Sequence, residues 1–194
     1  MQEGRSGEFA RAWDAEILER PPLIAPARQS VYPQRVAGEE EALARGALLL
    51  MVRPVSGDPF LATCARGFTD PRMPTAVFGC PNRREMCAVA GGYAYVVDTT
   101  APEHCVQIPL RPVIEVWALV EHSLLVFVGF QSIAAWGPGG LAWESARLSW
   151  EGVRLTAVEG GELRGFGWDM QTDKEVEFVL DLRTGKHTGG AAPR

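Results

Sequence analysis

Short apolar segments separated by turn residues make up most of the chain after residue 46. Val, Leu, Phe, Trp and Tyr fill these segments, and Gly or Pro interrupts them about every eight to twelve residues, as in all-β sandwiches, barrels and propellers. The pattern predicts a mainly β fold of repeated antiparallel hairpins, propeller-like or sandwich-like, over residues 47–190. The expected strands are 47–53, 60–66, 75–80, 86–90, 93–98, 105–109, 113–121, 124–130, 132–136, 141–148, 153–158, 162–168, 175–181 and 186–188.

The beginning of the chain follows a different pattern. Phe9, Trp13 and Ile17 recur every four residues, which is the spacing of one helix face, and they predict a short N-terminal helix over residues 7–19. Its apolar stripe either docks on the β domain or recruits a partner. We favour docking, because burying each such side chain is worth about 1.5–3 kcal/mol.

A proline-rich connector is expected after this helix. Residues 20–37 contain four prolines, which favour extended backbone at the residues that precede them. A short helical turn is expected over residues 38–45. The sequence thus predicts an N-terminal region of residues 1–46, with helix and connector, followed by an all-β domain of residues 47–190.

Three stretches of the β domain superpose as a strand, a two-residue break and a second strand. The breaks are Gly91-Gly92, His122-Ser123 and Gly160-Gly161. Two-residue hairpin loops favour positive φ, which glycine adopts without steric cost, so the two Gly-Gly breaks match hairpin chemistry. IAAWGPGGLAW (133–143) superposes in a similar way on FVLDLRTGKHT (178–188). The sequence therefore predicts repeated hairpin units.

This strand–turn–strand rhythm, which ends in the hairpin VLDLRTGK (179–186), resembles the blades of β-propeller proteins, including WD-type and quinoprotein-like repeats. The resemblance covers roughly residues 60–190 and implies blade-like repeating units. At about 45 residues per blade, the chain holds at most four units. A closed propeller, an open stack, a sandwich and a ring completed by oligomerisation all fit this length.

The charge of the chain restricts its partners. A formal net charge of −5 argues against sequence-independent binding to DNA or RNA, which needs a concentrated basic surface. The first twenty residues are charged throughout and do not resemble a signal peptide, and no apolar run has the length of a membrane span. We therefore expect a cytoplasmic protein that binds neither nucleic acid nor membrane. Abundant Ala, Gly, Pro and Arg favour a GC-rich bacterial source.

The four cysteines form no metal-binding motif, because no two of them are separated by only two residues. A zinc site made from Cys80, Cys87 and Cys105 is one interpretation of the spacing. Buried, inert thiols are the better one, and in the cytoplasm Cys64 and the other three would stay reduced. No cofactor and no metal are expected.

Histidine is scarce, which limits hydrolytic catalysis. Only His104, His122 and His187 could serve a Ser-His-Asp or Cys-His arrangement, and no G-x-S-x-G motif is present. We interpret His122 as a solvated histidine of a hairpin turn. RTGKHTGG (183–190) lacks the upstream glycine of a phosphate-binding loop and follows a strand without opening a helix, so it is expected to be a hairpin turn.

Acidic residues gather in DMQTDKEVE (169–177), where they suggest either a weak calcium site or a solvated strand face. The D-x-D-x-D-G spacing of a calcium loop is absent. Glu175 and Glu177 alternate with Val176 and Phe178, which is typical of a strand with one face in water. We therefore favour the solvated face.

Five of the six tryptophans lie between residues 117 and 168. Tryptophan more often seals a core between sheets, but it is also enriched in binding surfaces. Trp136, Trp143 and Trp168 are the candidate binding surface.

The first hypothesis for function is a non-catalytic binding or interaction module, which would bind a protein partner or self-associate. It follows from the lack of catalytic and cofactor motifs. The alternative is a glycosidase-like hydrolase with paired carboxylates in a Trp-lined cleft.

Overall fold

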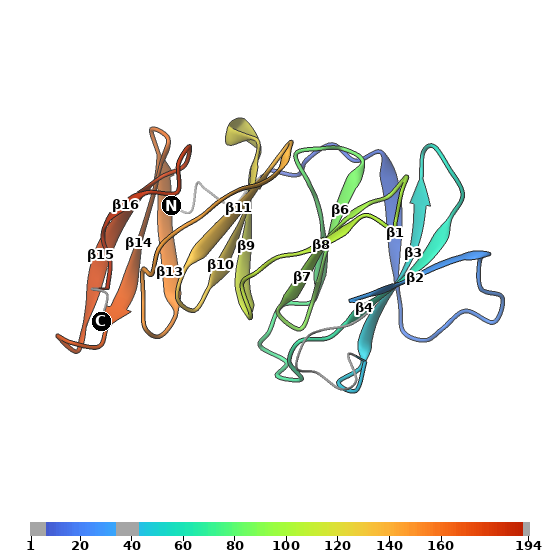
Figure 1. Cartoon of the computed structure of the whole chain (residues 1–194), viewed down its shortest axis with the longest axis horizontal. Coiled ribbons are helices and arrows are strands. Elements are labelled where there is room, and N and C mark those ends of the chain that lie inside the picture. Colours follow the sequence, from blue (N-terminus) through green and yellow to red (C-terminus); the bar gives the residue numbers. More distant parts are fainter. Residues whose placement is uncertain (1–6, 34–42, 192–194) are drawn as a thin grey trace. The chain divides into compact units, whose positions relative to one another are not determined.

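The computed structural model describes residues 7–33 and 43–191 and shows a mainly β protein (Figure 1). Over these residues the chain forms four four-stranded sheets, and its only helix is the three-residue 3-10 turn η1 (Val120–His122). No helix in the described ranges is long and apolar enough to cross a membrane. The predicted β fold is therefore confirmed at the level of repeated four-stranded sheets.

Three of the sheets are antiparallel meanders, in which each strand pairs with the next one along the chain. Sheet B contains β5 (Ala76–Gly79), β6 (Glu85–Ala90), β7 (Tyr93–Asp98) and β8 (Cys105–Gln107). Sheet C contains β9 (Val113–Leu119), β10 (Leu124–Gly129), β11 (Ile133–Gly137) and β12 (Gly140–Glu144). Sheet D contains β13 (Val153–Glu159), β14 (Glu162–Asp169), β15 (Lys174–Asp181) and β16 (His187–Gly189).

Sheet A has a different connectivity. Its strands are β1 (Trp13–Leu18), β2 (Arg28–Tyr32), β3 (Ala47–Pro54) and β4 (Phe60–Ala65), arranged in the order β1-β3-β4-β2. The pairs β1–β3 and β3–β4 are antiparallel, whereas β2 runs parallel to β4. The two strands that precede residue 34 therefore form the two edges of this sheet.

The contacts divide the chain into two compact units, each built on a pair of sheets. Of the described residues, the first unit comprises 7–8 and 113–191, and its core cluster joins sheets C and D through side chains such as Val126 and Phe178. The second unit comprises the described residues 9–33 and 43–112, and its core cluster joins sheets A and B. The position 46/47, at which the sequence suggested a domain boundary, lies inside this second unit.

The helix expected over residues 7–19 is wrong, because Trp13–Leu18 forms strand β1 and pairs with β3 from Trp13↔Pro54 to Leu18↔Leu49. Side chains alternate between the two sides of a strand, so residues four apart, such as Trp13 and Ile17, share one side of a strand just as they share one face of a helix. Pairing with β3 decides between the two structures. Trp13 is 5% exposed and Ile17 is 54% exposed, so the stripe is not buried as a unit.

The connector expected over residues 20–37 is also interrupted by a strand, β2. Proline occurs on both sides of this strand, and the tyrosyl hydroxyl of Tyr32 at its end donates a hydrogen bond to the carbonyl oxygen of Pro102. The helical turn expected over residues 38–45 lies mostly outside the described residues; residues 43–45 form a turn.

The predicted Gly-Gly hairpins are confirmed. Gly160 and Gly161 join β13 to β14 with φ values of 57° and 85°, and Gly91 and Gly92 join β6 to β7 with 55° and 81°. Positive φ at both central residues is the type I′ pattern, which matches the twist of antiparallel strands. At the third break, between β9 and β10, Ser123 has a φ of 52° and follows η1.

The superposition of the hairpins is wrong for one of the three. The breaks at His122-Ser123 and Gly160-Gly161 each join the first and second strands of a meander, whereas Gly91-Gly92 joins the second and third. The first strands of sheets B, C and D begin at Ala76, Val113 and Val153. Equivalent strands are thus about 40 residues apart, the length of a blade-like repeat.

Candidate functional site

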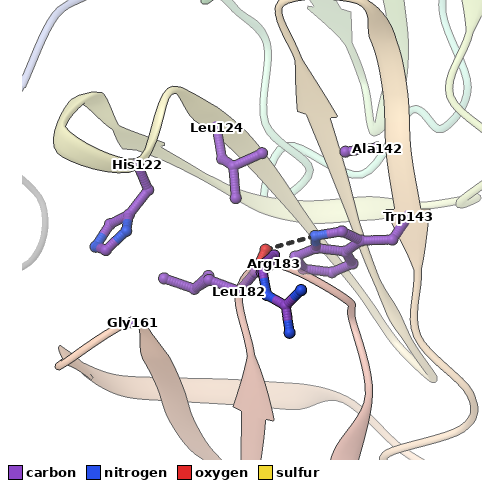
Figure 2. Close-up of a pocket in the computed structure, with 7 residues that line it drawn as sticks. All are labelled: His122, Leu124, Ala142, Trp143, Gly161, Leu182 and Arg183. Atoms are coloured by element: carbon purple, nitrogen blue, oxygen red, sulfur yellow. Dashed lines mark hydrogen bonds between the residues drawn. The ribbon is translucent and has the colours of Figure 1, made fainter.

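A pocket of about 250 Å³ opens where the turns of sheets C and D meet, at the end of the core of the first unit (Figure 2). We call it the turn pocket. It is lined by His122, Leu124, Ala142, Trp143, Gly161, Leu182 and Arg183. These residues come from four separate segments: η1 with β10, strand β12, the β13–β14 turn and the β15–β16 turn. The pocket is therefore a product of tertiary structure rather than of one loop.

A β-bulge in strand β12 directs Trp143 towards this pocket. Trp143 pairs with Ala135 and Leu141 pairs with Trp136, which leaves Ala142 as the extra residue. An extra residue on one strand bends it and changes the side on which the following side chains lie. Trp143 consequently joins the core cluster between sheets C and D, while Ala142 stays exposed at the pocket.

The indole of Trp143 is held by the turn between β15 and β16. Its Nε1–H donates a hydrogen bond of 2.7 Å to the carbonyl oxygen of Leu182 (Figure 2). The backbone amide of Leu182 in turn donates to the carbonyl oxygen of Gly161 at 3.0 Å. Gly185 has a φ of +70° and approaches the indole so closely that a Cβ there would lie 2.7 Å from Trp143 Cε3. The wall of the pocket is thus fixed by contacts between two sheets.

The β15–β16 turn is stabilised by Asp181. Its Oδ1 accepts hydrogen bonds of 2.8 Å from both the backbone amide and the hydroxyl of Thr184. The Thr184 hydroxyl holds the pKa of Asp181 below its usual value, and the positive charge of Arg183 acts in the same direction. The carboxylate therefore points into the turn, whereas the side chain of the neighbouring Arg183 lines the pocket.

His122 and Arg183 are the two lining side chains that can carry a charge, and both are exposed. Neither side chain forms a hydrogen bond or ion pair with another residue in the described ranges. His122 ends η1, as expected for a turn histidine, and the left-handed conformation of Ser123 follows it. The lining contains neither a carboxylate nor a Ser, Thr or Cys nucleophile, so His122 has no catalytic partner there.

The three tryptophans of the candidate binding surface differ in exposure, and only one of them lines the turn pocket. Trp136 and Trp143 are 5% and 8% exposed, and Trp168 is partly exposed on strand β14. Of the three, Trp143 lines the turn pocket, and its indole N–H is already bonded to Leu182. Tryptophan therefore contributes an apolar wall here rather than a flat exposed platform.

Arg183, Leu182 and Gly185 were not identified from the sequence as parts of a site. The signal that could have found them is the superposition of residues 133–143 on 178–188, which matches β11–β12 to β15–β16 as third and fourth strands of sheets C and D. This superposition indicates the β15–β16 hairpin, but it does not indicate that the hairpin places Arg183 in the pocket.

Replacing Gly185 by alanine is expected to lower stability more than replacing Gly160 by alanine. Both glycines have positive φ, which costs an L-residue about 1–2 kcal/mol. A Cβ at Gly160 meets nothing within 4 Å, whereas at Gly185 it would clash with the fixed indole of Trp143. The clash should add about 1–3 kcal/mol. Chemical denaturation of the two variants measures the difference, and equal losses would contradict the close contact with Trp143.

A second pocket, of about 240 Å³, lies in the other unit beside strands β2 and β8. Its lining consists of Tyr32, Pro33, Tyr95, Glu103, Cys105 and Gln107. Both tyrosyl hydroxyls donate to backbone carbonyls, and Gln107 Oε1 accepts from Arg111 at 3.3 Å. Glu103 Oε2 lies 3.6 Å from Arg28. Apart from the buried Gln107 Nε2, which has no hydrogen-bond partner among the described residues, the polar side chains named here have partners within the protein, so we consider the turn pocket the stronger candidate.

The cysteines Cys64, Cys80 and Cys87 are buried, and Cys105 is partly buried at the second pocket; all four are free thiols. No group of three metal-ligating side chains occurs within residues 7–33 and 43–191. Of the acidic stretch 169–177, Asp169 is 4% exposed and accepts a hydrogen bond of 2.7 Å from the Thr172 hydroxyl. Glu175 and Glu177 are exposed on β15, as expected for a solvated strand face.

Thiol reagents are expected to modify the native protein slowly at pH 8. Burial raises the pKa of all four thiols, and that of Cys105 to about 12, so little reactive thiolate is present. Cys105 should react first because it alone is partly exposed. A time course with and without denaturant measures this. Rapid modification of several thiols in the native protein would contradict the buried cysteines.

No family model, curated protein or solved structure matches this chain. The four-stranded sheets and their spacing are consistent with blade-like repeats. Among the described strands, each sheet is built from four strands that follow one another along the chain. No sheet of these described strands combines a strand from the N-terminal part of the chain with one from the C-terminal part.

Proposed function

We propose that this protein is a non-catalytic binding module, built on blade-like repeats of the β-propeller type, whose ligand occupies the turn pocket. The observation that carries the proposal is the composition of the pocket. Two exposed side chains that can be cationic flank an apolar wall, without a nucleophile or an acid/base pair beside them. Ligand pockets commonly combine an apolar lining with a few polar groups that fix orientation.

The rigidity of the turn pocket also supports binding. Its wall is fixed by the Trp143–Leu182 and Leu182–Gly161 hydrogen bonds, which join sheets C and D. A site whose walls are already ordered loses less conformational entropy when a ligand binds. The pocket is also open to solvent at Ala142, which leaves room for a small molecule or for a short segment of a partner protein.

The alternative, a glycosidase-like hydrolase, has less support. Such enzymes place two carboxylates on either side of the bond that they cleave. The lining of the turn pocket contains none, and the lining of the second pocket contains one, Glu103. Neither pocket offers an acid/base pair of the kind that this reaction needs.

The proposal is tested by blocking the turn pocket. Ala142 is exposed at its mouth, so Ala142→Trp should fill the opening without disturbing the core. Ligand-observed NMR with a library of neutral, cationic and anionic small molecules should detect compounds that compete for one site on the unmodified protein. We expect the Ala142→Trp variant to lose their binding.

Leu141→Trp is the matched control. It adds the same side chain at the neighbouring exposed position of β12, where Leu141 is 46% exposed and does not line the pocket. Binding should persist in this variant. The proposal fails if no compound binds the unmodified protein, or if Ala142→Trp binds the compounds as well as Leu141→Trp does.

A further inference from the structure

We infer that the turn pocket selects ligands that carry a single carboxylate attached to a short apolar group. The inference rests on the proposed function and adds the chemical class of the ligand.

The charges of the lining favour an anion. Arg183 and His122 are its only ionisable side chains, and the lining contains no Asp or Glu. The nearest carboxylate along the chain, that of Asp181, accepts two hydrogen bonds from Thr184, which hold it in the turn. Arg183 makes no ion pair with a described residue, so its donors are available to a ligand.

The backbone donors of the same turn are already used. The amide of Leu182 donates to the carbonyl oxygen of Gly161, that of Thr184 to Asp181 Oδ1, and that of Gly185 to the carbonyl oxygen of Asp181. Phosphate sites typically combine several free backbone N–H groups with positive charge. The turn pocket offers one guanidinium fork and one imidazole instead.

A guanidinium fork matches the two oxygens of a carboxylate, because both groups are planar and form two parallel hydrogen bonds. One arginine also balances one negative charge. A dianion would need His122 as a second cation, next to a protein whose net charge is −5. The site therefore fits a monocarboxylate better than a phosphate.

The remaining lining is apolar and specifies the rest of the ligand. Leu124, Leu182 and Trp143 are 8%, 3% and 8% exposed and supply most of the apolar lining. In Figure 2 the His122 ring and the Trp143 indole lie on opposite sides, with Leu182 and Arg183 between them. The indole N–H is bonded to Leu182 and cannot serve the ligand. A short alkyl or aryl group next to the carboxylate would cover this surface.

The carboxylate could belong to a free organic acid or to the C-terminus of a peptide. Isothermal titration calorimetry with five probes separates these sources: hexanoate, hexanamide, inorganic phosphate, and the peptide acetyl-Ala-Ala-Ala-Leu with a free and with an amidated C-terminus. We expect hexanoate or the free-carboxyl peptide to bind at least about tenfold more tightly than its amide. The tighter of the two identifies the source.

The role of Arg183 is tested with Arg183→Gln, which removes the charge and keeps most of the length of the side chain. Lys186→Gln is the matched control, because Lys186 is an exposed cation of the same turn that does not line the pocket. Arg183→Gln should weaken carboxylate binding at least about tenfold, whereas Lys186→Gln should change it less than about twofold. His122→Gln should weaken it by a smaller factor.

Three results would overturn the inference. The first is that the amides bind as tightly as the carboxylates. The second is that phosphate binds more tightly than either acid. The third is that Arg183→Gln binds the carboxylates as tightly as Lys186→Gln does. In each case the proposed binding module would keep its support, with a different ligand, if library compounds bind the unmodified protein and lose their binding in the Ala142→Trp variant. If no probe and no library compound binds, the inference and the proposed function both fail.

Discussion

Replacing Trp13 by alanine is expected to destabilise the second unit, that of sheets A and B, by about 3–5 kcal/mol, the usual cost of deleting a buried tryptophan side chain. Trp13 is 5% exposed within the core cluster of sheets A and B. Its Nε1–H donates a hydrogen bond of 3.0 Å to the carbonyl oxygen of Glu85, which begins β6. The side chain thus connects edge strand β1 to the opposite sheet.

Ile17→Ala is the matched control for this prediction, because Ile17 is on the same strand and is 54% exposed. Its effect should stay within about 0.5 kcal/mol, as for other exposed positions. Hydrogen exchange at the amides of β3 and β4 measures the stability of this unit separately from that of the rest of the chain. Similar losses for both variants would indicate one continuous apolar face, as in the helix that the spacing first suggested.

Replacing Trp143 by alanine is expected to destabilise the other unit by a similar amount, about 3–5 kcal/mol. Its indole is 8% exposed, belongs to the core cluster of sheets C and D, and bonds to a carbonyl oxygen of the β15–β16 turn. Loss of the indole leaves a cavity and an unpaired carbonyl at Leu182. The turn pocket should lose its wall at the same time.

Leu141→Ala, on the same strand at a 46% exposed position, should change stability by no more than about 0.5 kcal/mol. Hydrogen exchange in β14 and β15 reports on the stability of sheet D in both variants. If Trp143→Ala left that exchange unchanged, the indole would not connect the two sheets in solution.

The β strands after residue 46 could be predicted because each has a local cause. Apolar segments of β length alternate with turn residues, and glycine pairs such as Gly160-Gly161 adopt the positive φ that a two-residue hairpin needs. The register between repeats could not be obtained in this way. Gly91-Gly92 has the same local chemistry as Gly160-Gly161 but joins a different pair of strands in its sheet.

Strand β1 could not be predicted because its cause is not local. The spacing of Phe9, Trp13 and Ile17 fits a helix, and the partner that makes the segment a strand is β3, which begins at Ala47. Tertiary pairing of this kind routinely overrides local propensity. The same holds for β2, whose parallel partner β4 begins at Phe60.

Only part of the candidate site was accessible to sequence analysis. Trp143 was singled out as an aromatic residue, and His122 was placed correctly in a turn. The pocket itself depends on the bulge at Ala142 and on a hydrogen bond between Trp143 and Leu182, which are 39 positions apart. No pattern along the chain indicates that the guanidinium of Arg183 lies beside that tryptophan.

The measurement that tests the binding proposal most directly is a pair of two-dimensional ¹H–¹⁵N NMR titrations of the assigned full chain, one with hexanoate and one with the free-carboxyl peptide acetyl-Ala-Ala-Ala-Leu. We predict saturable shifts that concentrate on the backbone amides of the turn pocket and on the indole Nε1–H of Trp143, because that proton lies in the pocket wall. Saturable shifts centred on Tyr32, Tyr95 and Cys105 would place the binding site in the second pocket instead. That result, or the absence of any saturable shift, would contradict the account.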